Sequence, residues 1–180
     1  MKNTFTTLFI CLLTAASALA QTAKDSSENY NSYGGKVGVG ISIFDGVGIP
    51  VRFYLSPKNV LEAGFYFGAI VVITDDQLEI LGGPLVGVGY TYFGNRFEKP
   101  KYQKIRANGV AVRFNHLAGD YSTSMLSLGW AMETIRKKHP QRSFILELGL
   151  KQTFPNFEYN GVAIKATTGL YLRCHWNLFL

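Results

Sequence analysis

Apolar side chains recur at every second position in eight segments of the chain, and these apolar positions carry no formal charge. The segments run over 37–43, 49–55, 61–67, 86–92, 110–114, 126–132, 144–150 and 164–178. Because side chains alternate across a β-strand, each segment presents one apolar face and one face of a different kind. The pattern predicts eight antiparallel strands that share a single apolar surface.

The positions between the apolar ones hold glycine, polar and charged residues. A soluble barrel buries its apolar face and exposes its charges, whereas a barrel in lipid does the reverse. An eight-stranded barrel has an interior only wide enough for side chains. We therefore expect glycines to make room for charges that pair in a closed lumen with a net charge of +3. These charges are Arg52, Glu62, Arg113, Glu147, Lys151, Lys165 and Arg173.

These two faces together predict an all-β fold, an eight-stranded antiparallel up-and-down transmembrane β-barrel over residues 35–180. Residues 1–20 have the form of a secretory signal peptide, with Lys2, a short apolar stretch and an Ala18-Leu19-Ala20 cleavage site. Residues 21–34 are polar and without periodicity, which indicates a flexible lead-in. A signal peptide followed by such a barrel predicts the cell outer membrane as its location.

Turn-forming sequences separate the strands, and their charges alternate in sign. The odd-numbered connections contain six acidic residues and no basic ones. The even-numbered connections, among them a basic segment near 133–142 that includes Glu133, sum to +8. Alternate connections of an up-and-down barrel lie at the same end, so this sorting predicts an acidic end and a basic end. Two points stay open: which end faces the periplasm, and whether 101–107 forms an extra strand that ends in a hairpin turn at Asn108-Gly109.

Aromatic residues on the apolar face collect toward the basic end of the predicted strands. Rings at one level of a barrel form an interfacial girdle. Core aromatics are the alternative, although these need not gather at one rim. The predicted girdle consists of Phe53, Tyr90, Tyr92, Trp130 and Trp176.

Candidate chemistry is sparse. The three histidines lack metal-ligand spacing, so we expect no metal and no cofactor. His116 precedes Asp120, Ser122 and Ser124 across one connection, and a histidine, serine and carboxylate are the minimum for acyl transfer. The alternative is an interfacial histidine beside an ordinary turn. The basic connections suit anionic head groups better than nucleic acid, which a secreted barrel does not meet.

The phrases GVGYTYFGNRF, LGWAMET and LYLRCHWNLFL resemble the strands of small eight-stranded outer-membrane barrels. These are the families around outer membrane protein X and the barrel domain of outer membrane protein A, and the short Bacteroidota-type barrels. The alternating apolar residues before Leu180 are similar to the C-terminal strand signal that the barrel assembly machinery reads. The resemblance implies a non-catalytic envelope-structural or surface-interaction role, as a monomer among outer-membrane lipids and lipopolysaccharide.

Two other functions remain as alternatives to a structural barrel. One is a lipid A-modifying acyl hydrolase or transferase that uses His116. The other is a soluble periplasmic ligand-binding barrel, which would place the apolar face inside.

Overall fold

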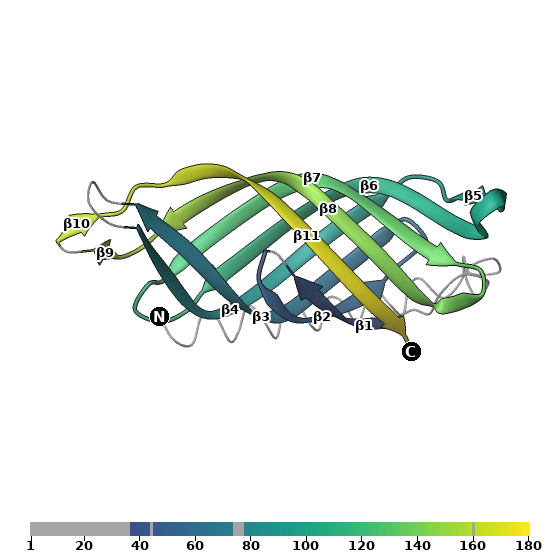
Figure 1. Ribbon diagram of the computed structural model, residues 1–180, viewed down its shortest axis with the longest axis horizontal. Coiled ribbons are helices and arrows are strands. Elements are labelled where there is room, and N and C mark those ends of the chain that lie inside the picture. Colours follow the sequence, from purple (N-terminus) through teal and green to yellow (C-terminus); the bar gives the residue numbers. More distant parts are fainter. Residues whose placement is uncertain (1–36, 44, 74–77, 160) are drawn as a thin grey trace.

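The computed structural model describes residues 37–43, 45–73, 78–159 and 161–180 (Figure 1). The predicted signal peptide and the polar segment 21–34 lie outside the described residues. Eight long strands form the wall of the molecule. They are β1 (Val37–Ile43), β2 (Val47–Tyr54), β3 (Asn59–Ile73), β4 (Leu78–Phe93), β6 (Lys104–Leu117), β7 (Thr123–Arg136), β8 (His139–Pro155) and β11 (Thr167–Phe179).

Each wall strand pairs antiparallel with its neighbours in sequence, and β1 pairs with β11 to close the barrel. The all-β, eight-stranded, up-and-down fold predicted from the sequence is therefore confirmed. Smaller elements lie within the connections at the two ends. They are β5 (Phe97–Lys99), the 3-10 helix η3 (Pro100–Tyr102), β9 (Glu158–Tyr159) and β10 (Val162–Ala163).

The strand register defines how strongly the strands tilt. We follow the paired residues from Val39 of β1 through each neighbouring strand to Thr168 of β11. If the β1–β11 register is continued to Thr168, this residue is opposite position 49. The shift around the barrel is thus ten residues. Eight strands about 4.8 Å apart with this shift tilt by about 40° from the barrel axis. The path passes through Val51, Ala63, Val88, Phe114, Leu126, Gln152 and Thr168.

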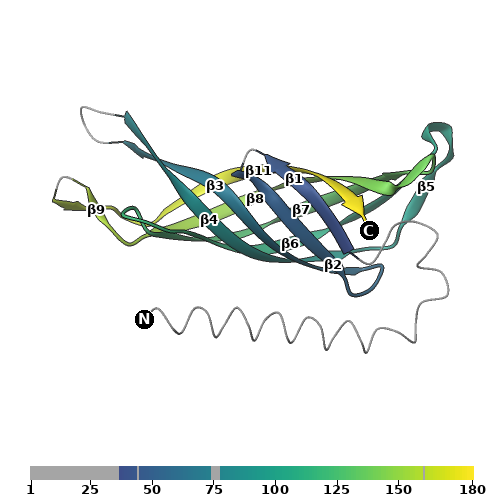
Figure 2. The same cartoon turned by 90° about the horizontal axis from the view of Figure 1, so that it is seen from below.

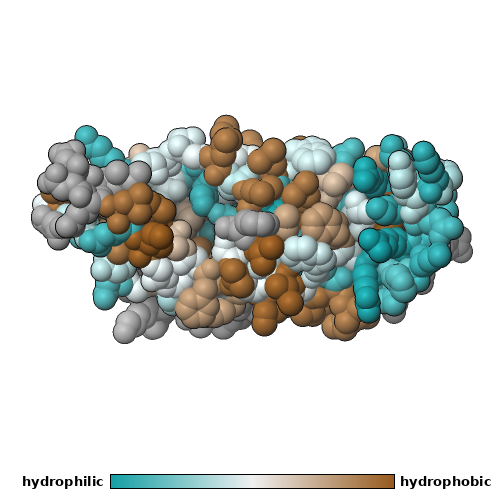
Figure 3. Space-filling view, viewed as in Figure 1, coloured by the Kyte–Doolittle hydropathy of each residue, from teal (hydrophilic) through white to brown (hydrophobic). Residues whose placement is uncertain are grey.

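The two faces of the wall differ as the alternation predicts. Leu128 and Leu148 on the outer face are 58% and 50% exposed, whereas Arg113 and Glu147 on the inner face are 1% and 0% exposed. Figure 3 shows hydrophobic side chains along the middle of the barrel and hydrophilic ones at the end that carries β5. The molecule is therefore polar at its centre and apolar on its surface, the reverse of a soluble barrel.

The connections are shorter than the sequence predicts at the basic end. Asn108 and Gly109 lie inside β6, where both pair with β7 and Gly109 also pairs with Phe93 of β4, so the hairpin turn that the sequence left open does not form there. The extra strand is β5, which pairs with Lys104–Arg106 at the start of β6. The basic stretch 133–142 is mostly strand, since β7 and β8 meet across only Lys137 and Lys138.

Both ends of the barrel sequence lie at this basic end, where the Leu180 amide donates to the Val37 carbonyl at 2.9 Å. The opposite end is uneven. Figure 2 shows that the β1–β2 hairpin stops well before β3 and β4 do. Its turn contains Gly46 with φ of +107°, a backbone conformation that favours glycine. The wall of the barrel is consequently shorter at β1 and β2 than at their neighbours, and we call this part the low wall.

Side chains fill the barrel in three levels. An apolar cluster that includes Tyr54, Val60 and Phe93 lies toward the basic end. A second apolar cluster lies toward the other end and consists of Tyr66, Leu85, Leu117 and Met125. The buried charges occupy the level between them. The prediction of a polar interior is therefore correct only for the middle of the barrel.

Candidate functional site

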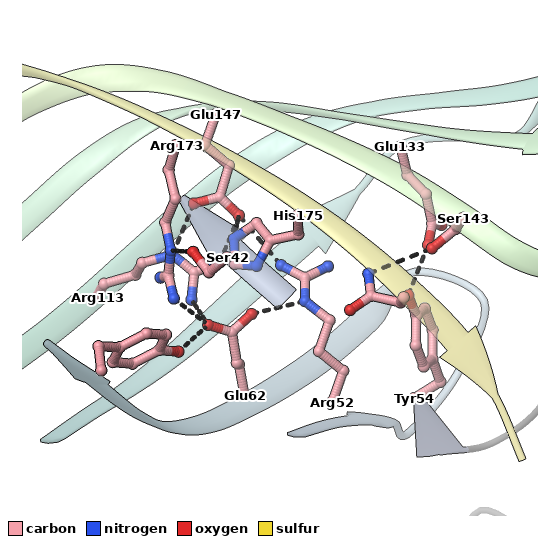
Figure 4. Close-up of polar contacts among 12 residues, drawn as sticks. Ser42, Arg52, Tyr54, Glu62, Arg113, Glu133, Ser143, Glu147, Arg173 and His175 are labelled. Carbon is pink, nitrogen blue, oxygen red and sulfur yellow. Dashed lines mark hydrogen bonds and ion pairs between the residues drawn. The ribbon is translucent and has the colours of Figure 1, made fainter. Parts of the chain in front are cut away.

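Two buried glutamates and two buried arginines form the centre of the interior (Figure 4). Arg52 Nε donates to Glu62 Oε2 at 2.6 Å, and its Nη2 reaches Glu147 Oε1 at 3.1 Å. Arg113 bridges the same carboxylates, with Nη1 2.6 Å from Glu62 Oε1 and Nε 2.6 Å from Glu147 Oε2. Its Nη2 also donates to Glu147 Oε1. Each carboxylate thus binds both guanidinium groups, which compensates the cost of burying them.

Three further side chains from β11 and β3 complete this network. Arg173 Nη2 lies 2.9 Å from Glu62 Oε1, and the same oxygen accepts a 2.9 Å hydrogen bond from Tyr66 Oη. The Arg173 guanidinium also stacks 4.6 Å from the centroid of the Tyr66 ring. His175 Nε2 is 3.7 Å from Glu147 Oε1. The network therefore ties together side chains from β2, β3, β6, β8 and β11.

Glycines on the inner face provide the space for these long side chains. A Cβ added at Gly89 would lie 3.0 Å from Cγ of Arg113 and closer still to its guanidinium. A Cβ at Gly64 would strike the Tyr66 ring, and one at Gly87 would strike Asn115. The glycines thus fit the large polar side chains that face them, as the sequence pattern suggested.

Two of the seven predicted lumen charges lie elsewhere. Lys165 is exposed in the connection before β11, because the final strand begins at Thr167 and not at 164. Its assignment to the lumen was wrong, and it also places one basic residue among the acidic connections. Lys151 does point inward, but it lies near the acidic end, where its Nζ is 2.6 Å from Oδ1 of Asp45.

Glu133 is a buried charge of β7, although the sequence pattern predicted it in the basic connection at 133–142. It lies on the inner face of β7 and is fully buried. Its Oε1 accepts a 2.5 Å hydrogen bond from Tyr54 Oη, and its Oε2 lies 2.7 Å from Arg96 Nη2. Glu133 is four residues from Gly129 on the same strand, so both face the same side of the wall. This alternation was the signal that could have placed Glu133 inside.

The predicted girdle residues lie on the outer face. Tyr90, Tyr92, Trp130 and Trp176 are between 40% and 49% exposed, and Phe53 is half-buried. Trp176 packs against Phe144 with ring centroids 5.3 Å apart, and Tyr90 Oη donates to Asn59 Oδ1. Large rings with polar tips therefore stand on the outer surface.

The candidate catalytic residues are only partly brought together. Nδ1 of His116 lies 3.2 Å from Oγ of Ser124, the residue opposite it on β7. The serine that His116 contacts is thus Ser124 and not Ser122. Asp120 is exposed in the turn between β6 and β7. The His116–Ser124 pair lies on the outer face at the acidic end. In this arrangement the His116 imidazole can polarise the Ser124 hydroxyl.

No group of three or more His, Cys, Asp or Glu side chains among the described residues is placed to hold a metal ion. No helix among them is both long and apolar enough to cross a membrane. Comparison of the chain with protein-family models, curated proteins and solved structures finds no match.

Proposed function

We propose that this protein is an integral outer-membrane β-barrel with a closed, ion-paired centre and a non-catalytic envelope-structural or surface-interaction role. The observation that carries the proposal is the inverted distribution of side chains, with Leu128, Leu148 and Leu172 outside and Arg113 and Glu147 inside. Apolar side chains on every wall strand would cost free energy in water, whereas hydrocarbon accepts them.

The barrel interior supports a structural role more than a transport role. Three arginines and two glutamates contact one another in the middle level, and apolar clusters lie on both sides of them. Ion pairs that are buried and hydrogen-bonded hold strands together, and they leave little room for a solute in an eight-stranded barrel.

The direct test uses isolated outer membranes. A folded barrel should resist extraction by alkaline carbonate, and it should shift its mobility on a denaturing gel only after boiling. Release into the carbonate supernatant would instead support a soluble periplasmic barrel, the alternative that the exposed apolar face disfavours. A wild-type sample unfolded in urea before loading is the control for the gel shift.

We propose that the basic end, with both ends of the barrel sequence, faces the periplasm. Two of the three connections at this end, 55–58 and 137–138, are short turns, as the periplasmic connections of bacterial barrels are. Its basic side chains would lie near anionic head groups. Single cysteines at Lys138 and Asp120, in a Cys174→Ser background, test this. A membrane-impermeant maleimide on whole cells should label position 120 and not position 138.

A second function, modification of lipid A, is favoured by the His116–Ser124 contact alone. Lipids of the outer leaflet would have to reach the outer-facing hydroxyl of Ser124. Its test compares lipid A masses from a deletion strain that expresses either the wild-type protein or His116→Ala. A mass change restored only by the wild type would support the enzyme, and identical lipid A in all strains would remove it.

A further inference from the structure

A cavity of about 650 Å³ opens where the wall is low, beside the β1–β2 turn. This volume lies within the range of small-molecule sites. Its lining comes from both faces of the wall. Leu85 and Met125 point into the barrel, whereas Val47 and Phe67 belong to the outer face and are 61% and 65% exposed. The cavity therefore connects the interior with the outer surface sideways, through the wall.

The low wall leaves two strand edges without a partner from the β1–β2 hairpin. The last β1 residue, Ile43, pairs with Cys174, so Thr167–Arg173 of β11 pairs with β8 alone among the described strands. In the same way, Gly68–Ile73 of β3 pairs with β4 alone. Backbone groups along these edges are available to hydrogen-bond a ligand at the opening.

The gap falls at the depth of the apolar surface. The seven residues of β1, tilted by about 40°, cover about 18 Å along the axis, while the apolar band of such barrels is about 25 Å tall. Val71, Ile80 and Leu170 beside the gap are 57%, 69% and 78% exposed. Apolar outer surface thus continues past the end of the hairpin, on both sides of the opening.

One polar pair marks the inner side of this cavity. Asp45 Oδ1 binds Lys151 Nζ at 2.6 Å, and the Asp45 side chain is only 7% exposed. Its other oxygen, Oδ2, is buried and has no hydrogen-bond partner among the described residues. A buried carboxylate oxygen is stabilised by a donor. A group that both donates and accepts, such as a hydroxyl or an amide, suits the pair.

We propose that this cavity binds a single-chain amphiphile that enters sideways through the low wall. Its hydrocarbon chain lies against Phe67, Leu85 and Met125, and its hydroxyl- or amide-bearing head hydrogen-bonds Asp45 and Lys151. Leu85 and Met125, which line the cavity, belong to the same apolar cluster as Tyr66, and the Tyr66 ring stacks in turn on Arg173 of the central network. The site therefore holds a ligand and does not conduct one, which goes beyond the structural role proposed above.

The test uses the full chain in phospholipid nanodiscs and a long-chain alcohol that carries a photoreactive diazirine. Mapping the labelled peptides should show saturable labelling near Leu85 and Met125. The matching fatty acid and alkylamine should compete less well than the unlabelled alcohol. Labelling that rises linearly with the probe, or that is equal on outward-facing residues all around the barrel, would overturn the site.

Variants separate the cavity from the surrounding lipid. Met125→Trp fills the cavity and should abolish saturable labelling, whereas Leu126→Trp, on the outer face one residue further, should leave it unchanged. Gly68→Val is a second filling variant, since a Cβ there would lie 2.8 Å from Leu85 Cδ1. Unchanged labelling in both filling variants would overturn the site.

The polar pair has its own test in the same assay. Asp45→Asn should weaken binding of the alcohol by about tenfold, the effect of losing one hydrogen bond to a charged group. Equal affinity in Asp45→Asn would overturn the assignment of the head group. Each variant is first checked for the gel shift of a folded barrel, so a failure to insert is distinguished from a failure to bind.

Discussion

Arg113 and Glu147 form a bidentate ion pair, although they lie on β6 and β8, which are separated by β7. Arg113 Nε is 2.6 Å from Glu147 Oε2, and Nη2 donates to Oε1 of the same carboxylate. Both side chains are almost fully buried. The pair therefore bridges β7 on the inner face of the wall and restrains two strands that do not pair with each other through their backbones.

Removal of the Glu147 charge should destabilise the barrel strongly. Glu147→Gln leaves Arg52 and Arg113 with one carboxylate between them, and breaking a buried pair costs about 3–5 kcal/mol. We expect a lower urea midpoint for unfolding from lipid vesicles, followed by tryptophan fluorescence. The control is Glu98→Gln, which breaks the exposed pair with Lys137 and should cost less than about 1 kcal/mol. Equal midpoints for the two variants would contradict a stabilising network.

The inner glycines should tolerate side chains unequally. Gly89→Val places atoms against Arg113 and should destabilise the barrel by about 1–3 kcal/mol, as overpacking does. Gly169→Val is the matched control, because a Cβ at Gly169 meets nothing within 4 Å. Urea midpoints measure both. If Gly169→Val were the more damaging of the two, the packing account would be wrong.

A charge on the apolar face should hinder insertion. Leu128 lies midway along β7 and is 58% exposed, so Leu128→Arg would carry a cation into hydrocarbon at a cost of about 2–4 kcal/mol. The fraction of folded protein in vesicles, read from the gel shift, should fall. Lys138→Leu, in the turn beyond β7, is the control and should insert normally. Normal insertion of Leu128→Arg would count against the membrane proposal.

The filled interior predicts a barrel without conductance. Reconstitution into planar lipid bilayers should give no discrete current steps, because the ion network and the two apolar clusters occupy the lumen. Protein heated before reconstitution controls for leaks caused by detergent. Steady single-channel steps that disappear in the heated sample would show an open pore instead.

The wall of the barrel could be predicted because strand alternation is local and lipid would enforce it along every strand. The ends could not. Turn-forming or charged residues at 133–142 suggested a connection, yet beyond the apolar belt a strand tolerates Arg136 and Arg142 as readily as a turn does. Lys165 was misplaced for the same reason, since the final strand begins three residues later than predicted and leaves this side chain outside the wall.

The central site shows the same division. Parity predicted that Arg52, Glu62, Arg113 and Glu147 would face inward, but not which of them would meet. Those contacts depend on the register of all eight strands, which shifts by ten residues around the barrel. The cavity depends on where the β1–β2 hairpin ends relative to β3 and β11, a relation between strands far apart in the sequence.

The seam between β1 and β11 has a consequence for how the molecule assembles. All other wall ladders join strands that follow one another, and the longest of them, β3 with β4, contains fifteen residue pairs. In the described part of the chain the seam contains six pairs, between residues more than 130 positions apart. A long loop must close before such pairs form. The seam should therefore be the last strand pairing to form during folding and the first to separate under mechanical force.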